Sequence, residues 1–247
     1  MDLSRRLGSL VARSVAVKPA RLHGTQAVAS ITFDDFPRSA WLEGGPVLAR
    51  HGARATYYAA GGYCGRTVDG VRYFDESDLK AVAAAGHEIG AHGFAHRPAS
   101  ELSHAALADD AARNEEFLKA CLGGAAPVSY AFPYGAATLA AKRFCAARFA
   151  TARGVRAGVN DGKVDLAQLR TISLECRCWD EEAILAAIHR ARARQGWIVF
   201  YTHDVSERPT RFGSMPGMLD WVLKKLAAAE IAVLPVREAL PVALGTP

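Results

Sequence analysis

The sequence contains no apolar run that approaches the roughly 18 residues a membrane-spanning helix needs. Its N-terminal apolar stretch, from Leu7 to Val17, follows Arg5-Arg6 but is interrupted by Arg13, and no small-residue cleavage site comes after it. A secretory signal peptide needs an unbroken apolar segment of about 7–15 residues. We therefore expect residues 1–24 to form an N-terminal arm, no transmembrane segment to be present, and the protein to be cytoplasmic.

Cysteines in a redox or zinc-binding arrangement are also lacking. The chain has 5 cysteines, an odd number, and Cys176-Arg177-Cys178 is one residue too short for a CxxC motif. We expect reduced thiols, partly buried as small apolar side chains.

Clustered positive charge is missing as well. Lys and Arg number 30 against 25 Asp and Glu, for a net charge of +5, but they are scattered and no aromatic-basic stripe accompanies them. Proteins that bind nucleic acids concentrate basic residues on one face, so no nucleic-acid partner is expected.

What the sequence does contain is an alternation of short apolar segments and helical segments over its 247 residues. This alternation is typical of an α/β fold, a parallel sheet or barrel with outer helices, and residues 25–247 are expected to form one domain. The predicted strands are Val28–Phe33, Ala53–Tyr58, Glu88–Ala91, Val128–Phe132, Phe149–Thr151, Thr171–Leu174, Trp197–Tyr201 and Ile231–Leu234. The predicted helices begin at Ser77, Ser103, Asp180 and Pro216, and the first three end at Gly86, Gly123 and Gly196.

Polar residues occur at one repeated position, directly past a predicted strand. Asp34-Asp35, His92, Tyr134 and His203 each follow such a strand within two residues. In α/β folds the chemistry gathers where strands end and loops begin. We therefore expect these four segments to meet at one site.

His92 and His96 are four residues apart, a spacing that places both on one face of a helix or helical turn. With a carboxylate from Asp34-Asp35 they would supply three ligands and leave coordination positions open, as a catalytic metal requires. Nitrogen and oxygen ligands suit zinc, and also cobalt, manganese, nickel or iron. The alternatives are a turn or helix cap for the Asp pair and ordinary surface or core histidines.

Two further residues suit hydrolytic chemistry. His203 ends an apolar strand, where an imidazolium can act as a general acid; the alternative is a packed surface histidine. Pro133 and Gly135 shape a tight loop in which the Tyr134 backbone N–H can face a developing oxyanion.

In this order, the motifs resemble those of the polysaccharide deacetylase family, also called carbohydrate esterase family four or the chitooligosaccharide-deacetylase homology domain. The TFDD motif corresponds to Thr32–Asp35, and H-S/T-x-x-H to His92–His96 with Gly93 in the Ser/Thr place. R-x-P-Y/F-G corresponds to Ala131–Gly135, and L-x-H to Tyr201–His203. The resemblance covers Val28 to Leu240 and implies a distorted (β/α) barrel of about seven parallel strands with outer helices.

The resemblance also implies an activity: a metal-dependent hydrolase that removes N-acetyl groups from an N-acetylated saccharide. The metal, most readily zinc, would be held by Asp35, His92 and His96. The implied catalytic residues are Asp34 as the base, His203 as the acid and Tyr134 through its backbone amide.

Two motifs depart from the family pattern. The third-motif arginine, which orients the base in the family, is replaced by Ala131, and either Arg153 or Arg170 is available to supply the charge from another loop. The fourth motif, an Asp-Trp segment whose Asp tunes the acid histidine, is altered, with Trp179-Asp180 and Glu175 in about the right region.

Other functions remain compatible with these residues. The same metal set would serve an esterase or amidase on another small substrate, or a non-haem iron oxygenase, although the adjacent Asp34 favours hydrolysis. A non-catalytic carbohydrate-binding relative is the third possibility. Trp41 and Phe212 lie in loop-like segments after the first and fifth motifs and are the predicted sugar-stacking residues.

Overall fold

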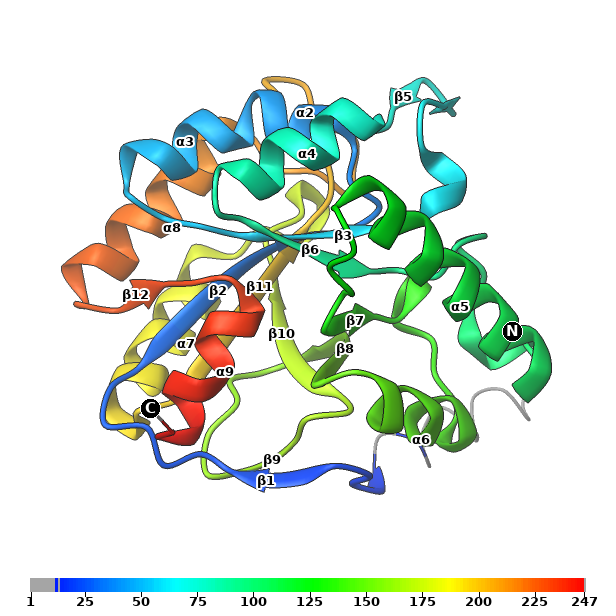
Figure 1. Cartoon of the computed structure of the whole chain (residues 1–247). Helices are drawn as coiled ribbons and strands as arrows, with labels where there is room; N and C mark the ends of the chain where they lie inside the picture. Colours follow the sequence, from blue (N-terminus) through cyan, green and yellow to red (C-terminus); the bar gives the residue numbers. More distant parts are fainter. Residues whose placement is uncertain (1–11, 13, 247) are drawn as a thin grey trace.

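Seven parallel strands close into a barrel in the computed structural model, which describes residues 12 and 14–246 (Figure 1). In barrel order these strands are β2 (Val28–Phe33), β3 (Thr56–Ala59), β6 (Glu88–Ala91), β7 (Ser129–Ala131), β8 (Thr151–Ala157), β10 (Leu169–Ser173) and β11 (Trp197–Thr202). The barrel closes because β11 also pairs with β2, from Trp197 opposite Val28 to Thr202 opposite Phe33. A short strand, β12 (Ala232–Val233), pairs with the start of β2. The predicted distorted (β/α) barrel is confirmed.

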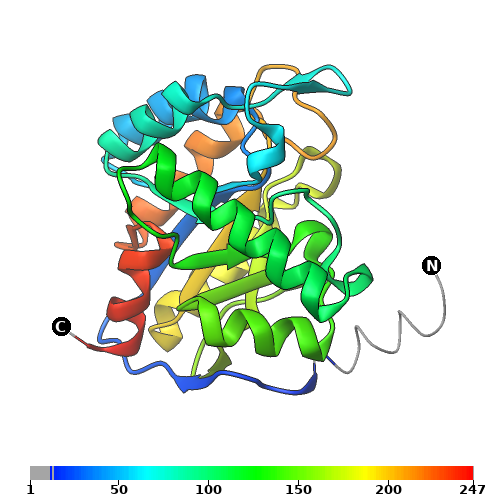
Figure 2. The ribbon, with the colours of Figure 1, turned by 45° about the vertical axis from the view of Figure 1, so that its right-hand side comes forward.

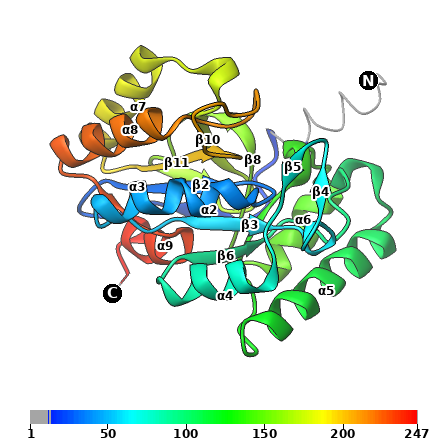
Figure 3. The ribbon, with the colours of Figure 1, turned by 90° about the horizontal axis from the view of Figure 1, so that it is seen from above.

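Helices surround the barrel, as the view from above shows (Figure 3). They are α2 (Arg38–Leu42), α3 (Gly44–Arg50), α4 (Glu76–Ala84), α5 (His104–Cys121), α6 (Leu139–Arg148), α7 (Glu181–Arg194), α8 (Pro216–Ala228) and α9 (Val236–Leu244). Single 3-10 turns lie at Gly61–Tyr63, Ala99–Glu101, Pro133–Gly135 and Cys176–Cys178. In the described part of the chain, no helix combines the length and the apolar character needed to cross a membrane.

The strands form because their sequences can be buried on both faces. Every residue of β2, β3, β6 and β11 is buried, as parallel strands covered on both sides require. At the amino end of the barrel, α9 packs through Val236 and Ala239 against Val28 and Trp197, the first residues of β2 and β11. This contact closes the amino end, so the opposite end is the one available for a site.

Helix starts follow capping chemistry, with one difference from prediction. Ser103 and Asp180 accept hydrogen bonds from Ala106 N and Ala183 N, as expected of the residues that begin α5 and α7. The cap of α4 is Asp75 rather than Ser77, because the Asp75 carboxylate accepts the N–H groups of Ser77 and Asp78 in a capping box.

Several strand boundaries differ from the sequence prediction by one to three residues, as in β3 and β10, and three differences are larger or of another kind. The strand expected at Phe149–Thr151 instead begins at Thr151 and runs to Ala157, and α9 was not predicted. Helix α7 ends on Gln195, which takes the left-handed conformation expected of Gly196.

The segment before the barrel packs along its lower edge in Figure 2, where β1 (Pro19–Arg21) pairs antiparallel with β9 (Lys163–Asp165). The ammonium of Lys142, which is buried, donates to the carbonyls of Ala12 and Val15 and contacts the Asp165 carboxylate at 2.7 Å. An arm boundary at residue 24 stays a prediction. The five cysteines are free thiols.

Candidate metal centre and active site

The carboxyl ends of the barrel strands open into a cavity of about 520 Å³. The polar residues that follow β2, β6, β7 and β11 all face it, as the shared strand-end position predicts. Each of the six predicted site residues lines this cavity: Asp34, Asp35, His92, His96, Tyr134 and His203.

Three of these side chains form a cluster that can hold a cation. The Nε2 atoms of His92 and His96 lie 3.0 and 2.8 Å from Oδ1 of Asp35, and one ligand atom of each residue lies within 4.8 Å of the others. Yet Oδ1 is buried and has no hydrogen-bond partner among the described residues. Nitrogen and oxygen atoms that lie this close without hydrogen bonds between them can share a cation as ligands. The set of Asp35, His92 and His96 therefore fits a divalent metal.

Each imidazole is oriented through its other nitrogen. Nδ1 of His92 lies 2.8 Å from the Ala131 carbonyl, which fixes it as a donor. Nδ1 of His96 lies 3.0 Å from the Tyr63 hydroxyl. Both contacts leave Nε2 directed toward Asp35, and the Ala131 carbonyl also sets the tautomer of His92.

The chain around the two histidines is an irregular loop, so the predicted helical turn is wrong. Gly93 has a φ of +67° and His96 a φ of +50°. The loop is held by Asp110 of α5, whose carboxylate accepts the N–H groups of Phe94 and Ala95 at 2.9 and 2.8 Å. A Cβ on Gly93 would lie 2.7 Å from Asp110 Oδ2. This close approach, together with the positive φ, explains glycine in the Ser/Thr place of the motif.

The electrostatics of the cluster favour an ionised carboxylate. Burial by itself would raise the pKa of Asp35, but His92 and His96 beside it hold that pKa well below its usual range. Burial would lower the pKa of His92, but the contacts and charges of Asp35 and Asp34 raise it. The cluster therefore presents an anionic ligand between two imidazoles.

Asp34 is not part of this cluster. Its carboxylate forms a buried ion pair with Nη2 of Arg153, which comes from β8. The other candidate, Arg170, is exposed and donates to the Ala157 carbonyl instead. The structure thus identifies which arginine neutralises Asp34.

His203 faces the cavity beside Asp35, with its Nε2 3.9 Å from Asp35 Oδ2. Its Nδ1 lies 3.2 Å from the Phe212 carbonyl and 3.5 Å from Oε1 of Glu175. Asp180, the other acid of the altered fourth motif, caps α7. Of the two acids of the altered fourth motif, Glu175 is therefore the one whose carboxylate lies beside His203.

The aromatic residues divide between cavity and core. Phe212 lines the cavity as predicted, with the guanidinium groups of Arg177 and Arg211 centred 4.5 and 5.4 Å from its ring. The prediction for Trp41 is wrong, because its ring packs edge-on against Tyr57 and His87. Its indole is partly buried against the core.

Sequence reasoning missed one wall of the cavity. The hairpin of β4 (Thr67–Val68) and β5 (Val71–Arg72) and the loop after β11 lie side by side at this end of the barrel (Figure 2). Val68, Asp69 and Val71 of the hairpin face the cavity, next to the stacked rings of Tyr63 and Tyr73, whose centroids are 4.3 Å apart. The Asp69-Gly70 turn signals a hairpin, but nothing in it indicates the cavity.

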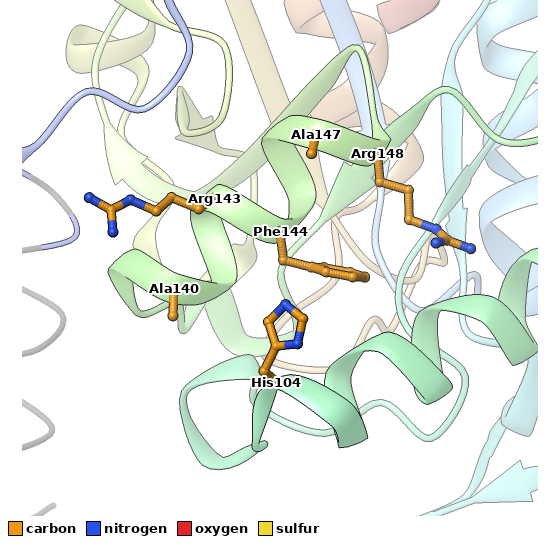
Figure 4. A pocket seen from close by; sticks show the side chains of 6 residues that line it. All are labelled: His104, Ala140, Arg143, Phe144, Ala147 and Arg148. Carbon is orange, nitrogen blue, oxygen red and sulfur yellow. The ribbon is translucent and has the colours of Figure 1, made fainter.

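A second hollow lies between α5 and α6 (Figure 4). Its lining consists of His104, Ala140, Arg143, Phe144, Ala147 and Arg148. None of these six can act as a carboxylate ligand, and Arg148 is engaged with Glu115 of α5. This hollow therefore offers no ligand set like that of Asp35, His92 and His96.

Comparison with known proteins gives a consistent result. A family model described as polysaccharide deacetylase matches residues 22–149. None of the curated proteins compared with this chain matches it.

Several solved structures share the fold. A peptidoglycan N-acetylglucosamine deacetylase, Bc1960, is 15% identical with a TM-score of 0.63, over 92% of this chain and 92% of its own. A family 4 acetyl xylan esterase from Clostridium thermocellum, in complex with a cobalt ion, is 19% identical with a TM-score of 0.62, over 89% of this chain and 93% of its own. A CE4 family pseudoenzyme from Bacillus anthracis is 16% identical with a TM-score of 0.62, over 90% of this chain and 68% of its own. At such identities the likeness extends to the fold alone.

Proposed function

The chain belongs to the polysaccharide deacetylase family, and from this premise we propose that it is a metal-dependent hydrolase that removes N-acetyl groups from an N-acetylated saccharide. The observation that carries the proposal is the cluster of Asp35, His92 and His96, with Asp34 beside it, in one cavity. Two imidazoles and one carboxylate leave coordination positions open. A neighbouring carboxylate outside the ligand set suits the proton transfers of hydrolysis.

We expect zinc at this cluster, with cobalt, manganese, nickel and iron as chemically compatible substitutes. When bound, the metal supplies Lewis-acid polarisation of the acetyl carbonyl and of the attacking water. Asp35, His92 and His96 would hold it through Oδ1 and the two Nε2 atoms, which lie nearest one another.

Asp34 acts as the general base. Its carboxylate is buried and ion-paired with Arg153, so it is held outside the ligand cluster although it adjoins Asp35 in the chain. As water adds to the acetyl carbon, Asp34 accepts the water proton. The backbone N–H of Tyr134, in a turn with a φ of +58°, donates to the oxyanion that forms.

His203 acts as the general acid. Its Nδ1 side is occupied by the Phe212 carbonyl and Glu175, which leaves Nε2 free toward the cavity. When the C–N bond breaks, Nε2 gives a proton to the departing sugar nitrogen, because an amine leaves poorly unless protonated. An O-acetyl ester would need the same groups with a different leaving atom, so acetyl esters are the second substrate class to test.

The proposal is tested by acetate release from N-acetylated chitooligosaccharides. We expect activity from the metal-loaded protein, loss of activity with a chelator, and recovery when zinc or cobalt is returned. Asp34→Asn should keep its metal but lose about 100- to 10,000-fold in kcat, the usual contribution of a general base. Asp109→Asn, an exposed change on α5, is the matched control and should behave as the wild type.

One result would contradict the proposal: a full metal content together with no acetate release from a broad panel of N-acetylated sugars and acetyl esters. Sugar binding without turnover, measured by calorimetry on the same samples, would then favour a non-catalytic carbohydrate-binding role.

A further inference from the structure

We propose that Arg153 is the residue that positions the base Asp34, a task carried out from β8 because β7 has alanine at the matching place. This inference rests on the proposed function, since it assigns Asp34 its partner in that reaction. Arg153 lies outside the metal cluster and does not line the cavity, so it acts through Asp34.

The register of the barrel places the two positions side by side. β7 and β8 pair in parallel with Ala131 directly opposite Arg153. Cross-strand partners project their side chains to the same face at the same level, and neighbouring strands are only about 4.8 Å apart. An arginine on either strand can therefore reach the same carboxylate. Ala131, fully buried, provides only a methyl group there.

The surroundings of Arg153 make Asp34 its one anionic partner among the described residues. The side chain is 1% exposed. Its guanidinium carbon lies 4.7 Å from the Tyr58 ring centre and 5.5 Å from that of Tyr201, and its Nη1 contacts the Gly154 carbonyl at 3.5 Å. A buried guanidinium needs an opposite charge, so the two aromatic rings aim the cation and the Asp34 carboxylate completes its charge balance.

Asp34 is held at both ends. Its backbone N–H donates to the Thr202 carbonyl of β11 at 2.9 Å, and its carboxylate is held by Arg153. Without the ion pair, an aspartate next to Asp35 would be free to turn into the ligand cluster. A planar guanidinium fixes a carboxylate in direction as well as in distance. The ion pair thus keeps the base separate from the metal ligands.

The test compares four forms of the metal-loaded enzyme: Arg153→Ala, Arg153→Lys, the swap Ala131→Arg/Arg153→Ala, and the control Arg170→Ala. For Arg153→Ala we expect kcat to fall by about 100-fold or more, as for loss of general-base action, with KM within about threefold and metal content unchanged. The swap variant should have a kcat at least tenfold higher than that of Arg153→Ala, because it returns a guanidinium to the same face. Arg153→Lys should retain part of the activity, and Arg170→Ala all of it.

A second measurement does not depend on activity. The unfolding transitions of Arg153→Ala, Asp34→Asn and their combination form a double-mutant cycle. We expect the combined variant to unfold at a higher temperature than the sum of the two single shifts predicts, because each single change leaves a buried charge alone.

Different failures have different meanings. An inactive wild type would refute the proposed function. The double-mutant cycle would then be the remaining test of the interaction between Arg153 and Asp34, and additive shifts in unfolding temperature would refute that interaction. An active wild type with Arg153→Ala within threefold of it would overturn the positioning role. So would a large loss that neither Arg153→Lys nor the swap recovers, provided that either variant shows a native unfolding transition.

Discussion

Asp35, His96 and Tyr134 share a backbone conformation that side chains other than glycine rarely adopt. Their φ values are 63°, 50° and 58°, and Asp69, which also lines the cavity, has a φ of 49°. Each such residue costs roughly 1–3 kcal/mol and persists only where its surroundings hold it. The ligand cluster is therefore held in position by the fold.

Asp35→Asn is the sharpest single-residue test of the ligand set. Asparagine keeps the shape and tolerates the left-handed conformation, so the change removes little except the negative charge between two imidazoles. We expect metal affinity to fall by about 100-fold or more, since loss of an outer partner alone costs roughly 10- to 100-fold. Competition with a chelating dye measures it.

Asp69→Asn is the matched control for that experiment, because Asp69 faces the same cavity with a similar φ but lies outside the cluster. It should bind metal as the wild type does. Equal affinity in Asp35→Asn and wild type would remove Asp35 from the ligand set.

At the residue scale, the sequence indicated which side chains come together where they belong to short motifs. The Asp pair and the two histidines each lie within five residues at a strand end, so their spacing was informative. The sequence does not distinguish Arg153 from Arg170 as the partner of Asp34. The contact between Arg153 and Asp34 spans 119 residues, and no local pattern indicates such a pair. For the same reason the sequence does not decide between Glu175 and Asp180 as the carboxylate beside His203. Glu175 reaches His203 because two loops meet in the folded chain.

At the scale of elements, prediction followed burial. β2, β6 and β11 were found within a residue because their apolar runs are continuous. β8 was misplaced because its centre is Arg153-Gly154, which a barrel accepts only when the arginine has its carboxylate partner. α9 was missed because Pro241 lies inside it, where proline usually ends a helix.

The contact of α6 with the N-terminal segment makes a testable stability element. Lys142 is 1% exposed and uses its three protons on Ala12, Val15 and Asp165. Asp165→Asn removes the only opposite charge among these partners and should cost about 3–5 kcal/mol in urea unfolding. Lys142→Met should cost less, because Asp165 retains backbone N–H donors from Val17 and Lys18.

Lys119→Met is the control, because the Lys119–Glu115 pair within α5 is half exposed and such pairs contribute roughly 0.3–0.5 kcal/mol. A cost for Asp165→Asn no larger than for this control would refute a structural role for the buried pair.

The same pair predicts an acid sensitivity. Burial alone would raise the pKa of Asp165, but Lys142 and the backbone N–H groups of Lys18, Val17 and Ala167 lower it. A lowered folded-state pKa gives stability that is complete above the unfolded value of about 3.9 and is lost as pH falls through the folded value. Urea unfolding from pH 5 to pH 2 should therefore show a steeper loss in the wild type than in Asp165→Asn.

For the whole molecule, the cluster ties distant parts of the barrel together. Asp35 follows β2, whereas His92 and His96 follow β6, two strands further round. A cation bound there joins segments that follow two strands separated by β3, and its three ligands come together only in the folded chain. Metal removal should therefore be visible in global stability as well as in activity.

At a free metal concentration 100 times the dissociation constant, binding adds about 2.7 kcal/mol, and a domain of this size shifts its Tm by roughly 2–4 °C per kcal/mol. We therefore expect a chelator to lower Tm by roughly 5–11 °C at pH 8, measured by calorimetry. The difference should shrink as pH falls, because a proton competes for Nε2. Asp35 and Asp34 raise the pKa of His92 against the effect of burial. The chelator-dependent difference in Tm should therefore begin to shrink above pH 6.5, the ordinary histidine pKa of roughly 6.5. Asp35→Asn, with its metal affinity lowered about 100-fold, should show a chelator effect of only about 1–2 °C under the same conditions. An equal Tm with and without chelator in the wild type would mean that no cation binds at this cluster.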